Sequence, residues 1–352
     1  MRLGLQLGYW GAAPPAGAAG LVAEAERAGF DGVFAAESWG SDAFTPLAWW
    51  GAATSRVRLG TSVAQLSARS PASCAMHALT LDHLSGGRCV LGLGVSGPQV
   101  VEGWYGAAFG KPLARTREYV SIIRQVLARE APVRNAGPHY PLPHRGAGSL
   151  GLGKPLRSIT HPLRADLPIW LGAEGPRNVA QTAEIADGWI AVYYSPRLAE
   201  VYQQWLADGF ARPGARRDRG TFEVAATCPL VVTDEPAEAK QQVKQSLSLY
   251  IGGMGAERMN FHADLFRRMG YAEAVADITR LFRDGRRSEA AGAVPDELVD
   301  DVAIIGDREH VRAAVRTWEE SGVDTLLVGC RSAEQIRAVA DAVLGAESLP
   351  RA

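Results

Sequence analysis

The chain has 352 residues, of which 47% are hydrophobic and 21% are charged, close to the averages of globular proteins, so a disordered chain is excluded. The 37 Lys and Arg residues balance the 38 Asp and Glu residues, and a net charge of -1 lacks the attraction that nucleic acid or an anionic membrane requires. Four distant cysteines without a C-x-x-C pair exclude a zinc ribbon and argue against a disulfide framework. No uncharged run approaches the ~20 residues that cross a bilayer, and the first residues lack signal-peptide features. The sequence therefore predicts a cytoplasmic protein without nucleic-acid or membrane partners.

Strand–loop–helix units repeat along the first third of the chain. The predicted strands are 3–7, 32–36, 57–63 and 89–93, each a short apolar run that ends near glycine or a polar loop. A helix is predicted over about 44–54, and another begins at Pro71 with Ser70 as its cap. Four such units in succession are typical of parallel β/α architecture.

Residues 131–166 interrupt this rhythm, because they are rich in Pro, Gly and His and show no periodicity. Four more strands then follow, at 168–171, 188–192, 222–232 and 325–328, and residues 235–300 are mostly helical. Asp307 is expected to cap a helix over 309–320, and Ser332 with Gln335 forms a capping box for the last helix. Eight strands predict one domain over residues 1–352, a (β/α)8 TIM barrel with an insertion after the fourth helix (131–166) and an extended helical seventh connection (235–300).

Aromatic residues gather in the loops that follow the predicted strands, where the active site of such a barrel lies. They are Trp10, Trp39, Trp104, Tyr193 and Tyr194. Rigid aromatic walls suit a flat, extended ligand, although barrel rims also pack aromatic residues against their own loops. Trp10, Trp39, Trp104 and Tyr194 are the predicted substrate pocket.

A segment of small residues opens a helix directly after the fifth strand, and it is the predicted phosphate site. The segment is Gly172, Ala173, Glu174, Gly175, Pro176, Arg177 and Asn178. Small residues let a ligand approach the backbone, and the free N–H groups and the dipole at a helix start attract an anion. Arg177 stands where acidic residues are usually preferred, which favours an anion site over an ordinary loop.

Residues 92–97 read G-x-G-x-x-G after a strand, which is the pattern of a dinucleotide-binding loop. Pro98 follows at once, the next helix is predicted only near Leu113, and no second strand ends in an acidic residue about 20 positions later. The motif is therefore interpreted as a barrel loop kept small for a ligand. The histidines show no metal-ligand spacing, so no metal is expected, and no hydrolase motif occurs.

Six stretches of the sequence carry a resemblance to a known family: RLGLQLGYWG, AERAGFDGVFAAES, RVRLGTSVAQLSARSP, ALTLDHLSGGRCVLGLGVSG, PIWLGAEGPRNVAQTAEIADGWI and IIGDREHVRAAVRTWEESGVDTLLVG. They resemble the luciferase-like monooxygenase superfamily, and more narrowly its actinobacterial branch of coenzyme F420-dependent oxidoreductases. The most specific parts are the turn at 82–88 and the run at 186–189. The resemblance omits residues 131–166 and about 235–300.

The resemblance implies a barrel that holds a flavin or deazaflavin in its mouth and transfers hydride at N5 or C5. It places a cis peptide bond between Ser62 and Val63, behind the ring. It also implies that Val95, Ser96, Gly97 and Tyr193 lie beside the cofactor, and that 172–178 receives its phosphate. A homodimer and a small-molecule substrate are implied in the same way.

Glu37 and Ser38 match an acid–histidine pair in the sugar-phosphate dehydrogenases of the superfamily, with Ser38 in the place of histidine. The general base for alcohol oxidation is therefore missing there, which favours reduction of a carbonyl, imine or activated alkene. Glu37, Ser38 or a bound water would then protonate the product, unless Glu37 is structural.

Three alternatives stay open on the sequence. The cofactor is F420 or FMN, and an FMN enzyme would act as a monooxygenase on reduced flavin and oxygen. A non-catalytic flavin-binding relative would bind without turnover. The polyglutamyl tail of F420 needs basic or polar surface, for which the candidates are Arg258, Arg267, Arg268, Lys154 and Arg157.

Overall fold

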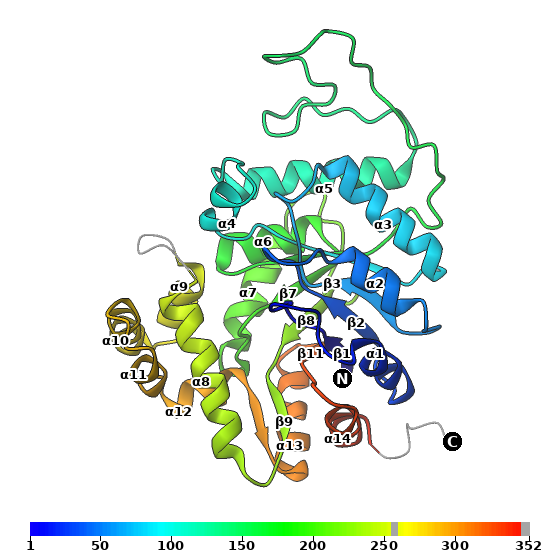
Figure 1. Cartoon of the computed structure of the whole chain (residues 1–352). Helices are drawn as coiled ribbons and strands as arrows, with labels where there is room; N and C mark the ends of the chain where they lie inside the picture. Colours follow the sequence, from blue (N-terminus) through cyan, green and yellow to red (C-terminus); the bar gives the residue numbers. More distant parts are fainter. Residues whose placement is uncertain (255–259, 346–352) are drawn as a thin grey trace.

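A closed barrel of parallel strands forms the centre of this computed structural model, which describes residues 1–254 and 260–345 (Figure 1). The barrel segments are β1 (Arg2–Gln6), β2 (Gly32–Ala35), β3 (Arg58–Thr61), β4 (Ala64–Gln65), β5 (Cys89–Gly94), β6 (Ile169–Gly172), β7 (Gly188–Ala191), β8 (Glu223–Thr227) and β11 (Thr325–Val328). Their order is β3-β2-β1-β11-β8-β7-β6-β5-β4, and β3 also pairs with β5, which closes the ring. Because β3 and β4 are two parts of one strand, the ring has eight strands, and the predicted TIM-like barrel is confirmed.

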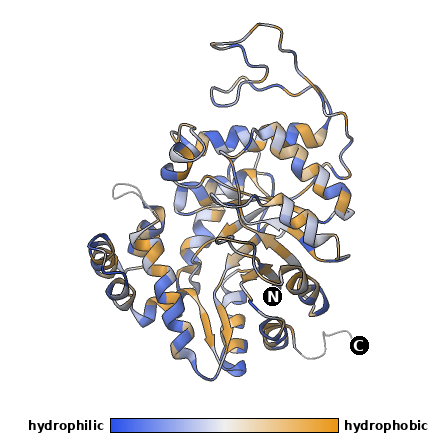
Figure 2. Cartoon of the chain, viewed as in Figure 1, coloured by the Kyte–Doolittle hydropathy of each residue, from blue (hydrophilic) through white to orange (hydrophobic). Residues whose placement is uncertain are grey.

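Helices surround the barrel. A second hydrophobic core lies in the seventh connection, the segment between β9 (Leu230–Val232) and β10 (Ile304–Gly306). The helices around the barrel are α1 (Ala18–Arg27), α2 (Phe44–Gly51), α3 (Pro71–Ser85), α4 (Pro98–Gly103), α5 (Pro112–Ala128), α6 (Pro176–Ile185), η1 (Pro196–Leu198), α7 (Ala199–Phe210), α13 (Arg308–Glu320) and α14 (Ala333–Leu344). The seventh connection contains α8 (Pro236–Gly252), α9 (Phe261–Arg268), α10 (Ala272–Arg283), α11 (Arg287–Gly292) and α12 (Asp296–Val302), packed around their own apolar cluster. In Figure 2 the barrel strands are mostly hydrophobic, whereas α13 shows a long hydrophilic face. None of the described helices is long and apolar enough to span a bilayer.

The helix caps predicted from sequence are confirmed. The side chains of Ser70, Asp307 and Ser332 accept hydrogen bonds from backbone N–H groups three residues later, at 3.2, 2.8 and 3.1 Å. Each cap satisfies a donor that the first turn of a helix leaves free.

The predicted strand 222–232 is wrong, because the chain bends at Cys228 and Pro229. β8 stays in the barrel, whereas β9 (Leu230–Val232) leaves it and pairs in parallel with β10 (Ile304–Gly306) in a separate two-stranded sheet. Proline has no N–H to give to a strand ladder, so it interrupts the run even though the residues on either side, Cys228 and Leu230, are apolar.

The insertion at 131–166 forms no helix and projects beyond α3 and α5 (Figure 1). Its root is held at Glu118 of α5, whose Oε2 accepts hydrogen bonds from Asn135 Nδ2 and from the backbone N–H groups of His139 and Tyr140, at 3.0 to 3.1 Å. The far part exposes Leu150 and Leu152 to solvent. The other end is held to α3, where Arg164 forms a 2.7 Å ion pair with Asp82. The predicted long loop is therefore anchored at both ends to barrel helices.

The barrel interior is filled by aromatic rings above a charged base. Phe34 stacks on Trp170 with ring centroids 5.6 Å apart, and glycine at position 60 makes room, since a Cβ there would lie 2.2 Å from the Phe34 ring. Below them, Arg58 lies 5.1 Å from the Trp170 ring and donates hydrogen bonds of 3.0 and 2.9 Å to Glu223. The barrel is therefore packed at its centre, as in other barrels of this type.

We expect Glu223→Gln to destabilise the protein in a pH-dependent way. Burial acts to raise the pKa of Glu223, but the hydrogen bonds and the charge of Arg58 outweigh it, and the pKa ends below its ordinary value. This stabilisation is complete above the unfolded carboxyl pKa of about 4.3 and is lost as the pH falls through the lowered folded pKa. Glu223→Gln should lower the free energy of unfolding by roughly 2 kcal/mol at pH 7 and by less toward pH 3, measured by urea unfolding.

The matched control is Glu289→Gln, since Glu289 pairs with Arg286 in the open, with both side chains about half exposed. That change should lower the free energy of unfolding far less than Glu223→Gln, because water screens an exposed ion pair. Equal losses of unfolding free energy in the two variants, or a loss in Glu223→Gln that does not change with pH, would contradict a stabilising role of the Arg58–Glu223 pair.

Candidate active site

A cavity of about 1820 Å³ opens at the carboxyl ends of the barrel strands, where the sequence places the site. This volume exceeds the 300–1,000 Å³ typical of a single small-ligand pocket, so there is room for a cofactor and a substrate together. The predicted residues that line it are Glu37, Ser38, Trp39, Ser62, Val63, Val95, Ser96, Gly97, Gly172, Ala173, Glu174, Gly175, Pro176, Arg177, Asn178 and Tyr193.

The break in the third barrel strand forms one wall of the cavity. The peptide bond between Ser62 and Val63 is cis, as the resemblance predicts. Gln6 Nε2 donates a 3.0 Å hydrogen bond to Ser62 Oγ, and Val63 packs against the apolar cluster inside the barrel. This wall therefore presents the apolar side chain of Val63 beside the polar side chains of Ser62 and Gln6.

Glu37 follows β2 and is 4% exposed. Its Oε2 accepts hydrogen bonds from Arg69 Nη1 at 3.0 Å and from the backbone N–H of Gln65 at 2.7 Å, and its Oε1 pairs with Arg69 Nη2. Burial acts to lower the pKa of Arg69, but the hydrogen bonds and charge of Glu37 raise it, so the guanidinium stays charged. Both carboxylate oxygens of Glu37 are thus engaged in holding Gln65 and Arg69 in place. Ser38 beside it is half-buried and has its side chain at the cavity.

The start of α6 is the place where the sequence predicts an anion site. No side chain caps this helix, so its first backbone N–H groups are available to a ligand. Arg177 is exposed in the first turn, and Arg268 of α9 reaches the same place, since a Cβ on Gly175 would lie 3.4 Å from Arg268 Nη1. Two guanidinium groups and a helix start therefore converge on one side of the cavity.

The other basic candidates for the cofactor tail lie elsewhere. Arg267 forms a 2.7 Å ion pair with Asp264, and Lys154 and Arg157 are exposed in the insertion, away from the cavity lining. Arg258 lies outside the described residues.

Three of the predicted aromatic pocket residues do not line the cavity. Trp10 packs against Trp50 of α2, with ring centroids 5.9 Å apart, and Trp104 is exposed at the end of α4. Tyr194 points outward, where its hydroxyl donates a 2.8 Å hydrogen bond to the carbonyl of Ser321. Tyr193 lies past the end of β7 with a φ of 55°, and at this turn its side chain lines the cavity while that of Tyr194 packs behind the barrel.

Sequence reasoning missed a cluster that α8 and α9 bring to the cavity. Tyr250 and His262 pack with Tyr193, and the ring centroids are 5.0 Å (Tyr250–His262), 5.4 Å (Tyr193–Tyr250) and 5.9 Å (Tyr193–His262) apart. His262 Nδ1 lies 2.8 Å from Glu174 Oε1. His262 has no sequence signal of its own, because its partners come from loops of the barrel far away in the chain.

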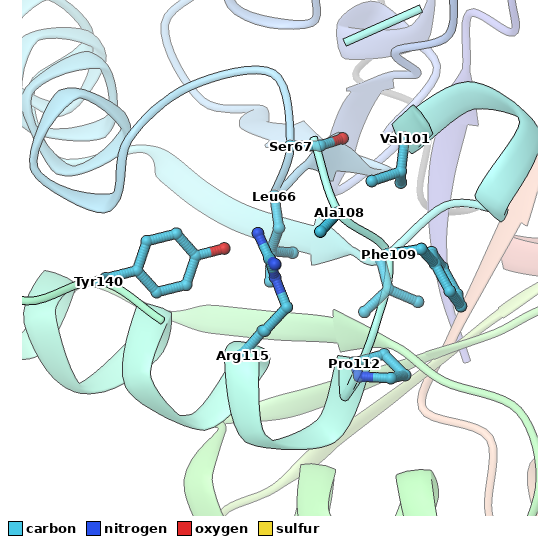
Figure 3. Close-up of a pocket in the computed structure, with 9 residues that line it drawn as sticks. Leu66, Ser67, Val101, Ala108, Phe109, Pro112, Arg115 and Tyr140 are labelled. Carbon is cyan, nitrogen blue, oxygen red and sulfur yellow. The ribbon is translucent and has the colours of Figure 1, made fainter. Parts of the chain in front are cut away.

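A second cavity of about 20 Å³ adjoins the first one and is shown in Figure 3. It shares Val95 and Pro112 with the large cavity, and Arg115 lies beside Tyr140, 5.4 Å from the ring centroid. This space is large enough for about one water molecule and too small for a substrate. Tyr140 at the root of the insertion lines this small cavity together with Val101, Ala108 and Phe109 of the segment after β5.

In the described part of the chain, no cluster of three or more His, Cys, Asp or Glu side chains could hold a metal ion.

The sequence and the fold match known proteins over almost the whole chain. The chain is 66% identical over 340 residues to a protein of Mycobacterium tuberculosis provisionally named coenzyme F420-dependent oxidoreductase Rv3520c, with 97% of this chain and 98% of that protein covered. It is 27% identical over 311 residues to 5,10-methylenetetrahydromethanopterin reductase of Archaeoglobus fulgidus, with 87% and 86% covered.

Among solved structures, the coenzyme F420-dependent tetrahydromethanopterin reductase of Methanopyrus kandleri superposes with a TM-score of 0.80 at 22% identity, covering 97% of this chain and 98% of that one. An F420-dependent secondary alcohol dehydrogenase in complex with an F420–acetone adduct superposes with a TM-score of 0.77 at 16% identity, covering 98% of both chains. The family model described as luciferase-like monooxygenase matches residues 4–325. This chain therefore belongs to the luciferase-like monooxygenase family.

Proposed function

We propose that this protein is a coenzyme F420-dependent oxidoreductase that transfers a hydride between C5 of the deazaflavin and a small organic substrate. The observation that carries the proposal is the single cavity of about 1820 Å³, which joins the wall at Ser62 and Val63 to the uncapped start of α6. A flat redox ring with a phosphate-bearing arm needs both features in one space. The name of the 66% identical mycobacterial relative favours F420 over FMN.

The polar groups of the ring wall fit a deazaflavin. The side-chain oxygens Oε1 of Gln6 and Gln65 are buried without a hydrogen-bond partner, and both residues line the cavity. Gln65 Nε2 donates to the carbonyl of Glu37 at 3.0 Å, which directs its oxygen away from that contact. A buried acceptor without a donor costs free energy, and the ring N–H on the pyrimidine edge of a deazaflavin supplies one.

Each part of the cavity then has a task. When bound, the deazaflavin supplies the hydride. Val63 supports the ring, and Gln65, fixed by Glu37 and Arg69, orients its polar edge. The first turn of α6, Arg177 and Arg268 hold the phosphate and the start of the acidic tail. The remaining volume, bounded by Trp39 and Ser38, admits the substrate.

We infer that the physiological direction is reduction of a carbonyl, imine or activated alkene. Serine at position 38 leaves no imidazole beside Glu37 to take a proton from an alcohol. Both oxygens of Glu37 already accept hydrogen bonds, which favours a positioning role for this side chain over the proton donation predicted from sequence.

A homodimer stays a prediction. Trp49 on α2, and Met76 and Leu84 on α3, are 62% to 79% exposed on helices that pack together, and burying such apolar surface between two copies favours association.

The test of the cofactor assignment is a fluorescence titration with oxidised F420 and with FMN. F420 should bind at least about tenfold more tightly than FMN, because Arg177 and Arg268 offer two cations, enough for the acidic tail of F420 as well as for its phosphate. Arg268→Met should weaken F420 binding about tenfold, and less so at high salt, which screens the contact. Tight FMN binding without F420 binding would reverse the assignment, and binding of F420 without any reduction or reoxidation would indicate a non-catalytic relative.

Arg267→Met is the matched control, since this neighbouring arginine of α9 is paired with Asp264 and does not line the cavity. It should leave both affinities within about twofold of the wild-type values. Equal effects of the two substitutions would remove Arg268 from the anion site.

A further inference from the structure

We propose that His262, held by Glu174, exchanges the proton with the substrate during hydride transfer. The proposal rests on the proposed function, because the hydride and its two electrons come from the reduced deazaflavin. In the reduction of a ketone, the hydride bonds to the carbonyl carbon, and the carbonyl oxygen takes a proton from the imidazolium of His262. The alcohol would then leave, and solvent water would return a proton to His262.

The position of His262 suits this task because it lies across the barrel mouth from Glu37. Glu37 follows β2, and the ring of His262 packs against Tyr193, which follows β7. In the closed ring, β1, β11 and β8 separate β2 from β7 on one side, and β3, β5 and β6 separate them on the other. The cavity therefore extends from Ser38 and the wall at Val63 to His262 on the opposite side, and a substrate that spans it contacts both sides.

The local contacts prepare His262 for proton transfer. Its Nδ1 lies 2.8 Å from Glu174 Oε1, in an ion-pair contact whose angles are not those of a hydrogen bond. The Glu174 side chain is 12% exposed, and its Oε2 is buried with no partner among the described residues. A carboxylate beside one ring nitrogen stabilises the imidazolium, and the His262 side chain lines the cavity.

The groups that surround His262 are the carboxylate of Glu174, two phenols and a guanidinium. Tyr193 of the β7 loop and Tyr250 of α8 stand edge-on to the imidazole, and burial raises the pKa of both phenols. Tyr250 is hydrogen bonded to Tyr9 of the β1 loop, and the cation of Arg268 lies at the other end of α9. Imidazole is the side chain whose charge ordinarily changes between pH 5 and 8.

The other titratable groups of the described cavity lining are poor proton donors at this pH. Burial raises the pKa of the Cys330 thiol to about 12, and it raises that of Cys228 as well. Glu37 is bound to Arg69, and His262 is the one histidine among the described lining residues. Among its described lining residues the cavity thus offers a single imidazole that can serve as the acid.

The first test is a pH titration of His262, measured by NMR on the protein without substrate. The ring-proton signal of His262, assigned from its loss in His262→Gln, should titrate at a lower pH in Glu174→Gln than in the wild-type protein. The carboxylate stabilises the charged ring, and its removal favours the neutral form. Identical titration curves in the two proteins would overturn the pairing.

The second test is reoxidation of bound reduced F420 by cyclohexanone and by cyclohex-2-enone, over pH 5.5 to 9. The wild-type rate should fall as the pH rises through the titration of the imidazole. His262→Gln should be about 100-fold slower and independent of pH, with an unchanged F420 dissociation constant. His77→Gln is the matched control, because His77 is an exposed residue of α3, and it should keep the wild-type rate and pH profile.

The outcomes separate this inference from the proposed function. Absence of F420 binding in the wild-type protein defeats the proposed function. Binding and turnover with the same rate and pH profile in His262→Gln defeat only the role of His262. Binding without reoxidation by either acceptor overturns carbonyl reduction, and the role of His262 with it.

Discussion

Arg69→Met is expected to lower the free energy of unfolding by about 3–5 kcal/mol, the usual cost of leaving one member of a buried ion pair without its partner. The Arg69 and Glu37 side chains are 12% and 3% exposed, so water cannot replace the lost guanidinium. Only the backbone N–H of Gln65 would still donate to the Glu37 carboxylate. Thermal and denaturant unfolding measure the loss. F420 binding should weaken as well, because the same carboxylate fixes the strand that carries Gln65.

Two further variants make this expectation specific. The double variant Arg69→Met/Glu37→Leu should recover most of the lost stability, since it removes both charges. Arg280→Met, which breaks an exposed pair with Asp277 on α10, should cost less than about 1 kcal/mol. A double variant as unstable as Arg69→Met would mean that packing, and not an unpaired charge, is responsible.

Gly92→Ala is expected to cost at least about 3 kcal/mol and to abolish cofactor binding, although it adds one methyl group. A Cβ at this position in β5 would lie 1.9 Å from the backbone oxygen of Thr61 and 2.8 Å from Ile190 Cδ1. Thr61 Oγ1 also donates to the Gly92 carbonyl at 2.6 Å and accepts from its N–H at 2.9 Å. The strand that carries the cavity wall would have to move away from β5.

Gly103→Ala is the control, because a Cβ at the end of α4 meets nothing within 4 Å. This change should leave stability within about 0.5 kcal/mol of the wild type or raise it. A crystal structure of Gly92→Ala with an undisturbed third strand and wild-type affinity for F420 would show that the close approach is not required.

The sequence predicted most of the fold and many of the cavity residues, because both depend on local patterns. Apolar runs between glycines mark strands buried on both faces, and Ser70, Asp307 and Ser332 cap their helices through bonds to N–H groups three residues away. In a closed barrel all carboxyl ends of strands meet at one rim, so loop residues such as Ser96 and Gly175 reach one cavity. The failure at 222–232 arose where Pro229 interrupts a run that is otherwise mostly apolar.

What the sequence by itself determined is the eight-stranded barrel, its glycine-rich rim and the cis bond that the family resemblance places at Ser62. Only the tertiary structure decided which side chains meet. It turned Tyr193 into the cavity and Tyr194 away from it, engaged both oxygens of Glu37, and brought His262 to Glu174. These outcomes depend on contacts between elements that are distant in the chain. The order of residues fixes each element's own pattern, but side-chain direction and pairing follow from how the elements pack.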